Sequence, residues 1–189
     1  MKRAAWWEVV GAHAPADLVF VDESGASVKM ARADARAPRG ERAVGRVPRN
    51  HGTPTALVAA LTPDGLTATA TRLGAFDTAS FAAYVRDVLC PALRPGQVVV
   101  LDNLSAHKST AVREAIAAAG CAVLFLPPDS PDFAPIELAW AQVKAALRTA
   151  AARTQEALDA AIAAAWRRVT ADQARAFFGH CGYSLAQCA

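Results

Sequence analysis

Three acidic residues, Asp22, Asp102 and Glu137, have the type and the placement for metal chemistry. Asp22 directly follows the apolar run 18–21, and Asp102 follows the run 97–101, so both are expected at the carboxyl ends of buried strands. Ionised carboxylates at neighbouring strand ends repel one another and are costly to desolvate. Because Mg²⁺ and Mn²⁺ prefer oxygen ligands, the pattern predicts that a divalent ion lies between them.

Glu137 is the expected third ligand, at the start of a helix. Pro135 suits the first turn of that helix. Glu137 shares one helical face with Lys144 and Arg148, so this face would bind metal at its tip and then run beside a phosphate backbone. Three carboxylates can hold two metal ions ~4 Å apart, an arrangement suited to phosphodiester hydrolysis and strand transfer by in-line displacement.

The elements that must position these residues change in character along the chain. The first third predicts consecutive antiparallel strands, and strand and helix patterns then alternate before a helical final third. This order predicts an α/β fold, an RNase H-like mixed β-sheet flanked by α-helices, in which the first and fourth strands lie side by side. We expect one domain over 1–189. The expected strands are 18–21, 55–61, 66–72, 97–101 and 121–126. The expected helices are one capped by Asp77 or Thr78, one capped by Ser109 or Thr110 that runs through Ala119, and three over roughly 135–151, 154–168 and 171–178.

The residues around Asp22 carry two further expectations. Residues 22–25 have the composition of a turn that ends the first strand, and 27–32 could return as an additional strand. Strand alternation directs Glu23 to the face opposite Asp22, so Glu23 is not predicted as a ligand.

Composition and charge indicate a globular protein with an uneven surface. Hydrophobic residues make up 53% of the chain and charged residues 20%, no apolar run is long enough to span a membrane, and we expect a cytoplasmic protein. The net charge is +3, yet the segment 29–51 has seven basic and two acidic residues. Such a segment is either a DNA-binding surface or a solvated loop, and charge alone favours neither. Its candidate DNA contacts are Arg36, Arg39, Arg42 and Arg46.

The sequence around the acidic residues resembles the three signature blocks of DDE transposases. The matching segments are FVDESG (20–25), LDNLSAHK (101–108) and LPPDSPDFAPIELAW (126–140), and 36–45 and 177–183 are also similar. The likeness is to bacterial insertion-sequence enzymes of the Tc/mariner superfamily, whose spacing of 34 residues separates Asp102 from Glu137.

The resemblance implies a DNA transposase that uses Mg²⁺ or Mn²⁺, with two ions expected when DNA is bound. The implied metal ligands and catalytic residues are Asp22, Asp102 and Glu137. The implied partner is double-stranded DNA, both transposon ends and a TA target, bound by a homodimer in the active complex. In a bacterial cell the protein would be associated with the nucleoid when bound to DNA.

The second block also contains Asn103, His107 and Lys108. We expect them to support the site, with Lys108 near DNA. His107 either contacts a phosphate or caps and packs within the fold. The role of the Trp6–Trp7 pair is likewise open between core and interface, and core is favoured.

Two departures from the family pattern affect the third block. Asp129 stands where the pattern has an aromatic residue, and Ala134 stands where it has an asparagine that would cap the helix of Glu137. Loss of such a cap costs about 1 kcal/mol of helix stability, so one hypothesis is that this copy is weakened.

The chain begins about twenty residues before Asp22, which leaves no room for the N-terminal helix-turn-helix modules that the resemblance implies. Either a separately encoded helix-turn-helix protein supplies them or the chain is a fragment. The alternative functions are a weakened or inactive transposase remnant that acts as a DNA-binding or partner-binding regulator, and a different RNase H-like nuclease such as a Holliday-junction resolvase.

Overall fold

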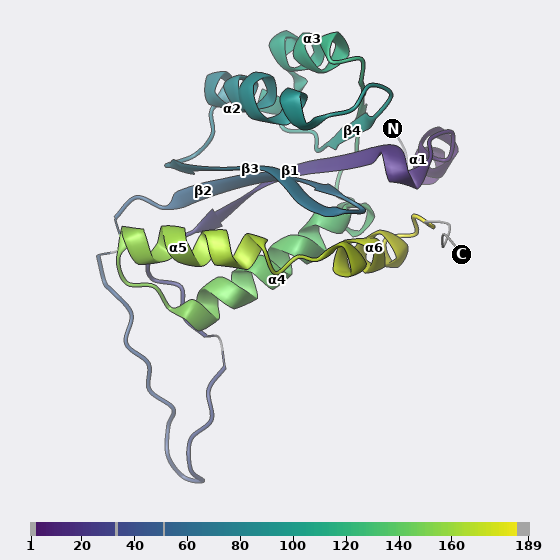
Figure 1. Cartoon of the computed structure of the whole chain (residues 1–189). Coiled ribbons are helices and arrows are strands. Elements are labelled where there is room, and N and C mark those ends of the chain that lie inside the picture. The colour runs from purple at the N-terminus through teal and green to yellow at the C-terminus, as the bar shows by residue number, and fades with distance from the viewer. Residues whose placement is uncertain (1–2, 33, 51, 185–189) are drawn as a thin grey trace.

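A five-stranded mixed sheet forms the centre of the protein, with the strand order β3-β2-β1-β4-β5 (Figure 1). The computed structural model describes residues 3–32, 34–50 and 52–184. β2 pairs antiparallel with β1 and β3, whereas β4 pairs parallel with β1 and β5. The strands are β1 (Leu18–Ala26), β2 (Thr55–Thr62), β3 (Gly65–Leu73), β4 (Val98–Leu101) and β5 (Ala122–Phe125).

Helices cover both faces of the sheet, because β1 and β4 are apolar on both sides. α2 and α3 lie on one face and α4, α5 and α6 on the other (Figure 1). The α-helices are α1 (Arg3–Val10), α2 (Thr78–Tyr84), α3 (Thr110–Ala118), α4 (Pro135–Ala150), α5 (Gln155–Trp166) and α6 (Ala171–His180). The shorter helical turns are η1 (Pro15–Asp17), η2 (Val85–Leu89), η3 (Cys90–Ala92), η4 (Ala106–Lys108) and η5 (Pro131–Phe133). The mixed sheet flanked by helices that the sequence predicts is therefore confirmed.

β1 is longer than the sequence predicts. Residues 22–25 do not form a turn, because β2 pairs with β1 continuously from Phe20 to Ala26 and satisfies its backbone hydrogen bonds. The segment 27–32 forms no strand, since β2 and β4 already occupy both edges of β1. The apolar run 18–21 predicts where β1 begins, but it does not show how far β1 pairs with β2.

The helix expected from residue 77 or 78 begins at Thr78, with Asp77 as its N-cap and Ser80 completing a capping box. It changes to a π-helix at Val85 and ends at the 3₁₀ turn of η3, which contains a proline. α1 is a helix that the sequence analysis did not predict.

A long arm, in which residues 27–32, 34–50 and 52–54 are described, leaves the sheet between β1 and β2 and projects beyond the C-terminal end of α4 (Figure 1). The Arg153 guanidinium holds the beginning of this arm by donating hydrogen bonds to the carbonyl oxygens of Val28 (2.8 Å) and Met30 (2.9 Å). Across the described parts of the chain, no helix combines the length and the apolar character needed to cross a membrane.

Candidate metal-binding site

Strand register places Asp22 and Asp102 side by side on one face of the sheet. In the parallel β1–β4 pair, Leu18 lies opposite Val98 and Phe20 opposite Val100. Continuing that register brings Asp22 level with Asp102, one position beyond the end of β4. The even-numbered residues of both strands pack in the core beneath α4, so both carboxylates belong to the α4 side of the sheet.

α4 brings the third carboxylate to the same place. Pro135 opens the helix, and its buried stripe, which includes Ile136 and Trp140, packs on the face that carries Asp22. Glu137 lies in the first turn and is exposed. The helix thus presents Glu137 at the pocket that Asp22 and Asp102 line. Only Asp102 follows the end of its strand as predicted; Asp22 lies in the middle of β1, because pairing with β2 continues to Ala26.

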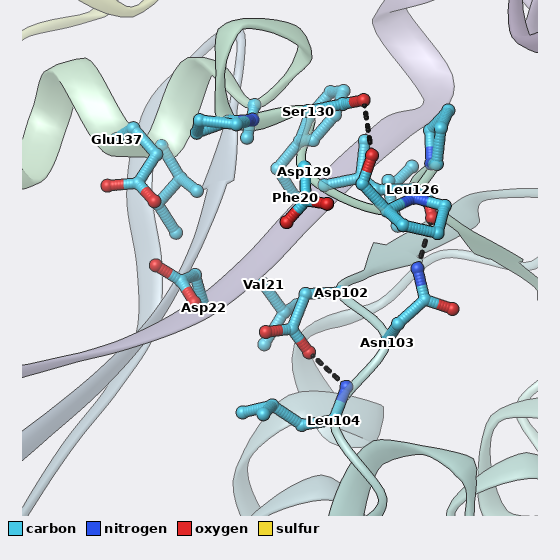
Figure 2. Close-up of a pocket in the computed structure, with 16 residues that line it drawn as sticks. Phe20, Val21, Asp22, Asp102, Asn103, Leu104, Leu126, Asp129, Ser130 and Glu137 are labelled. Atoms are coloured by element: carbon cyan, nitrogen blue, oxygen red, sulfur yellow. Dashed lines mark hydrogen bonds between the residues drawn. The ribbon is translucent and has the colours of Figure 1, made fainter. Parts of the chain in front are cut away.

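Asp22, Asp102 and Glu137 line one pocket of about 390 Å³, together with Asn103 and Asp129 among others. The carboxylates of Asp22 and Glu137 face each other, and Asp102 lies across the pocket from them (Figure 2). Within the described residues, no three acidic, histidine or cysteine side chains stand close enough to enclose a metal ion as they are. The three carboxylates therefore border an open site rather than a closed cage.

The carboxyl group of Asp22 has a strongly raised pKa. Its burial, with smaller contributions from the negative charges of Glu137 and Asp102, raises its pKa from 3.8 to about 6. The Trp140 indole N–H donates a hydrogen bond of 3.1 Å to Asp22 Oδ2. This bond holds one oxygen of the carboxylate, and the Asp22 side chain lines the pocket (Figure 2).

Asp102 is held by its own loop and by a buried histidine. Its Oδ1 accepts hydrogen bonds from the backbone N–H of Leu104 (2.9 Å) and from His107 Nδ1 (2.5 Å). Partial burial favours the neutral acid, but these hydrogen bonds and the nearby cations His107 and Lys108 lower the pKa of Asp102 below its ordinary value. Asp102 is consequently ionised, with Oδ2 available to a ligand.

His107 does not contact phosphate in this structure, because its side chain is completely buried and its ring packs on Phe81 at 4.1 Å between centroids. The packing alternative is the one observed. Its Nε2 lies 3.9 Å from Glu23 Oε1, too far for a hydrogen bond but close enough for an ion pair. Burial alone lowers the pKa of His107, yet Asp102 and Glu23 together raise it to about 9.

Glu23 lies on the side of the sheet opposite Asp22, as strand alternation predicts, and it does not line the pocket. The sequence analysis did not predict that Glu23 lies beside His107, which in turn bonds to Asp102. The only signal was the clustering of an acidic residue and a histidine within two of the resembling blocks. It also missed the bond from Trp140 to Asp22, although a buried indole N–H usually requires an acceptor.

The two departures from the family pattern both lie at this site. Asp129 lines the pocket and adopts a left-handed backbone with φ of 51°, a conformation that Asp tolerates better than most residues. Ala134 is the N-cap of α4, and no side chain caps the helix there. Asn103 Nδ2 donates a hydrogen bond to the Leu126 carbonyl, which ties the end of β4 to the end of β5.

The predicted basic DNA contacts occupy two regions. Lys108 is exposed, and the half-buried Lys144 and the exposed Arg148 follow Glu137 along α4, with Arg148 in its last turn. The other region is the arm, where four arginines are all exposed: Arg36, Arg39, Arg42 and Arg46. The structure therefore leaves all seven accessible to a ligand, whereas His107 is inaccessible.

The donor set fits a hard divalent cation. All three predicted ligands are carboxylates that line the pocket. Burial and the negative charges of Glu137 and Asp102 keep the pKa of Asp22 raised, although two hydrogen bonds partly offset them. A divalent ion would relieve that repulsion, and the side chains that orient its ligands, Trp140 and His107, are already in place.

A family model described as DDE superfamily endonuclease matches residues 17–159. No curated protein sequence matches the chain significantly. Among solved structures, the chain is similar to the Mos1 transposase paired-end complex with left transposon end, with a TM-score of 0.73 and 17% identity over 94% of this chain and 56% of that chain. It is also similar to a pre-cleavage Mos1 transpososome, with a TM-score of 0.69 and 14% identity over 94% of this chain and 56% of that chain.

The isolated catalytic domain of Mos1 mariner transposase gives a TM-score of 0.64 at 13% identity, over 94% of this chain and 82% of that domain. These similarities confirm the RNase H-like fold. The present chain spans 56% of the length of the Mos1 chains in the two complexes.

Proposed function

The chain belongs to the DDE superfamily endonucleases, and from that premise we propose that it is the catalytic domain of a metal-dependent DNA transposase of the Tc/mariner type. The observation that carries the proposal is the meeting of Asp22, Asp102 and Glu137 around one pocket, each from a different element of the fold. The reaction would be phosphodiester hydrolysis at element ends, followed by transfer of the freed strand into target DNA.

Asp22, Asp102 and Glu137 would hold Mg²⁺ or Mn²⁺, two ions when DNA is bound. The chemistry such ions supply is activation of the attacking oxygen and stabilisation of the leaving oxygen in an in-line displacement. Trp140 and His107 each occupy one oxygen of a ligand carboxylate. They would thereby fix the direction in which the other oxygen meets the metal.

The basic residues would bind the phosphate backbone on either side of the pocket. Along α4, Arg148 lies about 16 Å beyond Glu137, roughly the rise of five base pairs. Lys144 lies between them on the same face, and the last turn of α4 leads to Arg153, which anchors the arm. A duplex with its scissile phosphate at Glu137 would therefore meet positive charge along α4 and then on the arm.

The Mos1 structures contain a paired-end complex with a transposon end. By extension we propose that transposon-end DNA is the substrate here and that the active complex is a homodimer. Recognition of the inverted repeats would come from helix-turn-helix modules on a separate protein or on further sequence of the same protein.

The test is cleavage of duplex oligonucleotides that carry the element ends, with Mn²⁺, by the wild type and by Asp102→Asn. The asparagine oxygen can still accept the bonds from Leu104 and His107, so the variant should fold and yet lose cleavage by at least roughly 100-fold. Asp64→Asn is the matched control, because that side chain is 78% exposed in the β2–β3 turn.

Equal cleavage by wild type and Asp102→Asn would refute the proposal. No cleavage by any form, together with DNA binding, would favour the weakened-remnant alternative, which the missing cap at Ala134 and the substituted Asp129 support. Cleavage without strand transfer into TA sites would favour a different RNase H-like nuclease.

A further inference from the structure

Glu137 is the one predicted metal ligand that is not attached to the sheet. Asp22 lies within β1, and Asp102 follows β4 directly, whereas Glu137 depends on how α4 begins. The start of α4 lacks a side-chain cap. The segment 130–134 that leads into it must therefore be held by other parts of the protein.

A buried tyrosine at the C-terminal end of the described chain contacts this segment. The Tyr183 hydroxyl donates a hydrogen bond of 2.8 Å to the Phe133 carbonyl and accepts one of 3.0 Å from Trp6 Nε1. The indole can only donate, so the hydroxyl proton is left for Phe133. Trp6 is 0% exposed and Tyr183 3%, so the chain of bonds is shielded from water.

Aromatic packing reinforces the same contact. The Trp6 ring stacks on Phe133 with 6.5 Å between centroids, and Trp7 meets Phe133 edge-on at 5.2 Å. Trp7 passes so close to Gly182 that a Cβ there would lie 2.8 Å from its ring. Glycine at 182, with φ of 91°, is required for this approach.

Arg3 of α1 also contacts segment 130–134. Its guanidinium donates to Ser130 Oγ (2.9 Å) and to both oxygens of Asp132 (2.9 and 2.5 Å), and it lies 4.1 Å from the centre of the Phe133 ring. The ion pair is exposed and contributes little alone. The ion pair matters here because it contacts segment 130–134, which Tyr183 and Trp6 also hold.

We propose that α1 and Tyr183 form a buttress that positions Glu137 for metal binding. Both lie outside residues 17–159, the part that matches the family model, and Trp6 and Trp7 bring α1 into contact with Tyr183 and Gly182. Tyr183, Trp6 and Arg3 are positioning residues, since they act through segment 130–134. The metal-binding part of this inference rests on the proposed function.

The chain contains a matched pair of tyrosines for the test. Tyr84, like Tyr183, is buried and donates its hydroxyl to a backbone carbonyl at 2.8 Å, but that carbonyl belongs to Ala68 on the opposite side of the sheet. Tyr183→Phe and Tyr84→Phe each remove one hydroxyl and keep the ring. Both should lower the thermal midpoint of the metal-free protein, Tyr84→Phe by about 2–4 °C and Tyr183→Phe by more, because Tyr183→Phe also leaves the buried Trp6 N–H without its acceptor.

Only Tyr183→Phe should act on the site. It should weaken Mn²⁺ affinity, measured by calorimetry on the full chain, by about 10-fold. It should also speed hydrogen exchange in a peptide spanning 131–138 of the metal-free protein. Tyr84→Phe should change neither. Arg3→Ala removes an exposed side chain and leaves the buried contacts in place, and it should speed exchange in the same peptide.

Unchanged exchange in 131–138 for both Tyr183→Phe and Arg3→Ala would overturn the buttress. Equal effects of Tyr183→Phe and Tyr84→Phe on Mn²⁺ affinity would overturn its link to the metal. If the wild type bound no Mn²⁺ at all, the proposed function would fail, and the exchange measurement would still decide whether the buttress exists.

Discussion

Replacement of Asp22 by asparagine should stabilise the metal-free protein at neutral pH while removing its response to metal. In the folded protein the pKa of Asp22 is raised from 3.8 to about 6, chiefly by burial. A raised pKa means that the folded state binds the proton more tightly than the unfolded state does. Stability from this group is therefore complete below about pH 4 and is lost as pH rises through about 6.

The size of the effect follows from the pKa shift. At about 1.4 kcal/mol for each tenfold change in proton affinity, a rise from 3.8 to about 6 costs the ionised folded state up to about 3 kcal/mol. The asparagine would not carry this cost, and its amide oxygen could keep the bond from Trp140. For a chain of 189 residues, this corresponds to a thermal midpoint higher by up to about 6–12 °C.

The assay is thermal and urea unfolding of wild type and Asp22→Asn in a chelator, at about pH 3.5 and about pH 7.5, with the exposed Asp64→Asn as control. The advantage of Asp22→Asn should be present at the higher pH and should nearly disappear at the lower one. Addition of Mn²⁺ at the higher pH should raise the midpoint of the wild type but not that of Asp22→Asn. A variant less stable than wild type at the higher pH without metal, or an advantage that persists at the lower pH, would refute the reasoning.

Substitutions at three other places give distinct expectations. His107→Asn keeps a hydrogen-bond donor near the position of Nδ1, so its Mn²⁺ affinity should stay within about 3-fold of the wild type. His107→Leu has no donor and should lose about 10-fold in Mn²⁺ affinity. Equal losses for the two variants in calorimetry would contradict a role for the bond to Asp102. Ala134→Asn should supply the missing cap of α4 and raise the thermal midpoint by about 2–4 °C. If the missing cap weakens this copy, the substitution should also increase Mn²⁺-dependent cleavage. No gain in the midpoint or in cleavage would count against that hypothesis. Removing the four arm arginines together should weaken DNA binding, and the slope of log affinity against log[salt] should become shallower by at most about 3.6, with Arg86→Ala as control. An unchanged slope would mean that the arm does not touch DNA. The four are Arg36, Arg39, Arg42 and Arg46.

The acidic residues could be chosen from the sequence because their positions depend on local rules. A strand that is buried on both faces is a continuous apolar run, so the residues that follow 18–21 and 97–101 stand out as polar. Helical periodicity separated Glu137 from the buried stripe of α4 in the same way. Alternation along β1 also placed Glu23 on the other face of the sheet, where the structure has it.

Errors arose where pairing or contacts between distant segments decided the outcome. The four residues after Val21 have turn-like composition, yet β2 extends β1 through them to Ala26. A phosphate contact by His107 was one of two alternatives, but the side chain is enclosed between Phe81, Asp102 and Glu23. No local pattern predicts such neighbours, because they come from three separate elements.

The sequence by itself determined the strands and helices that carry the site, the face of each carboxylate and the chemistry of a hard-cation site. These depend on periodicity and residue type, which are local. Only the tertiary structure decided the parallel register that aligns Asp22 with Asp102, the bonds from Trp140 and His107, and the contact of Tyr183 with the segment before Glu137. The last of these joins residues 50 positions apart. Their meeting is set by the packing of whole helices on the sheet rather than by any preference of the residues themselves.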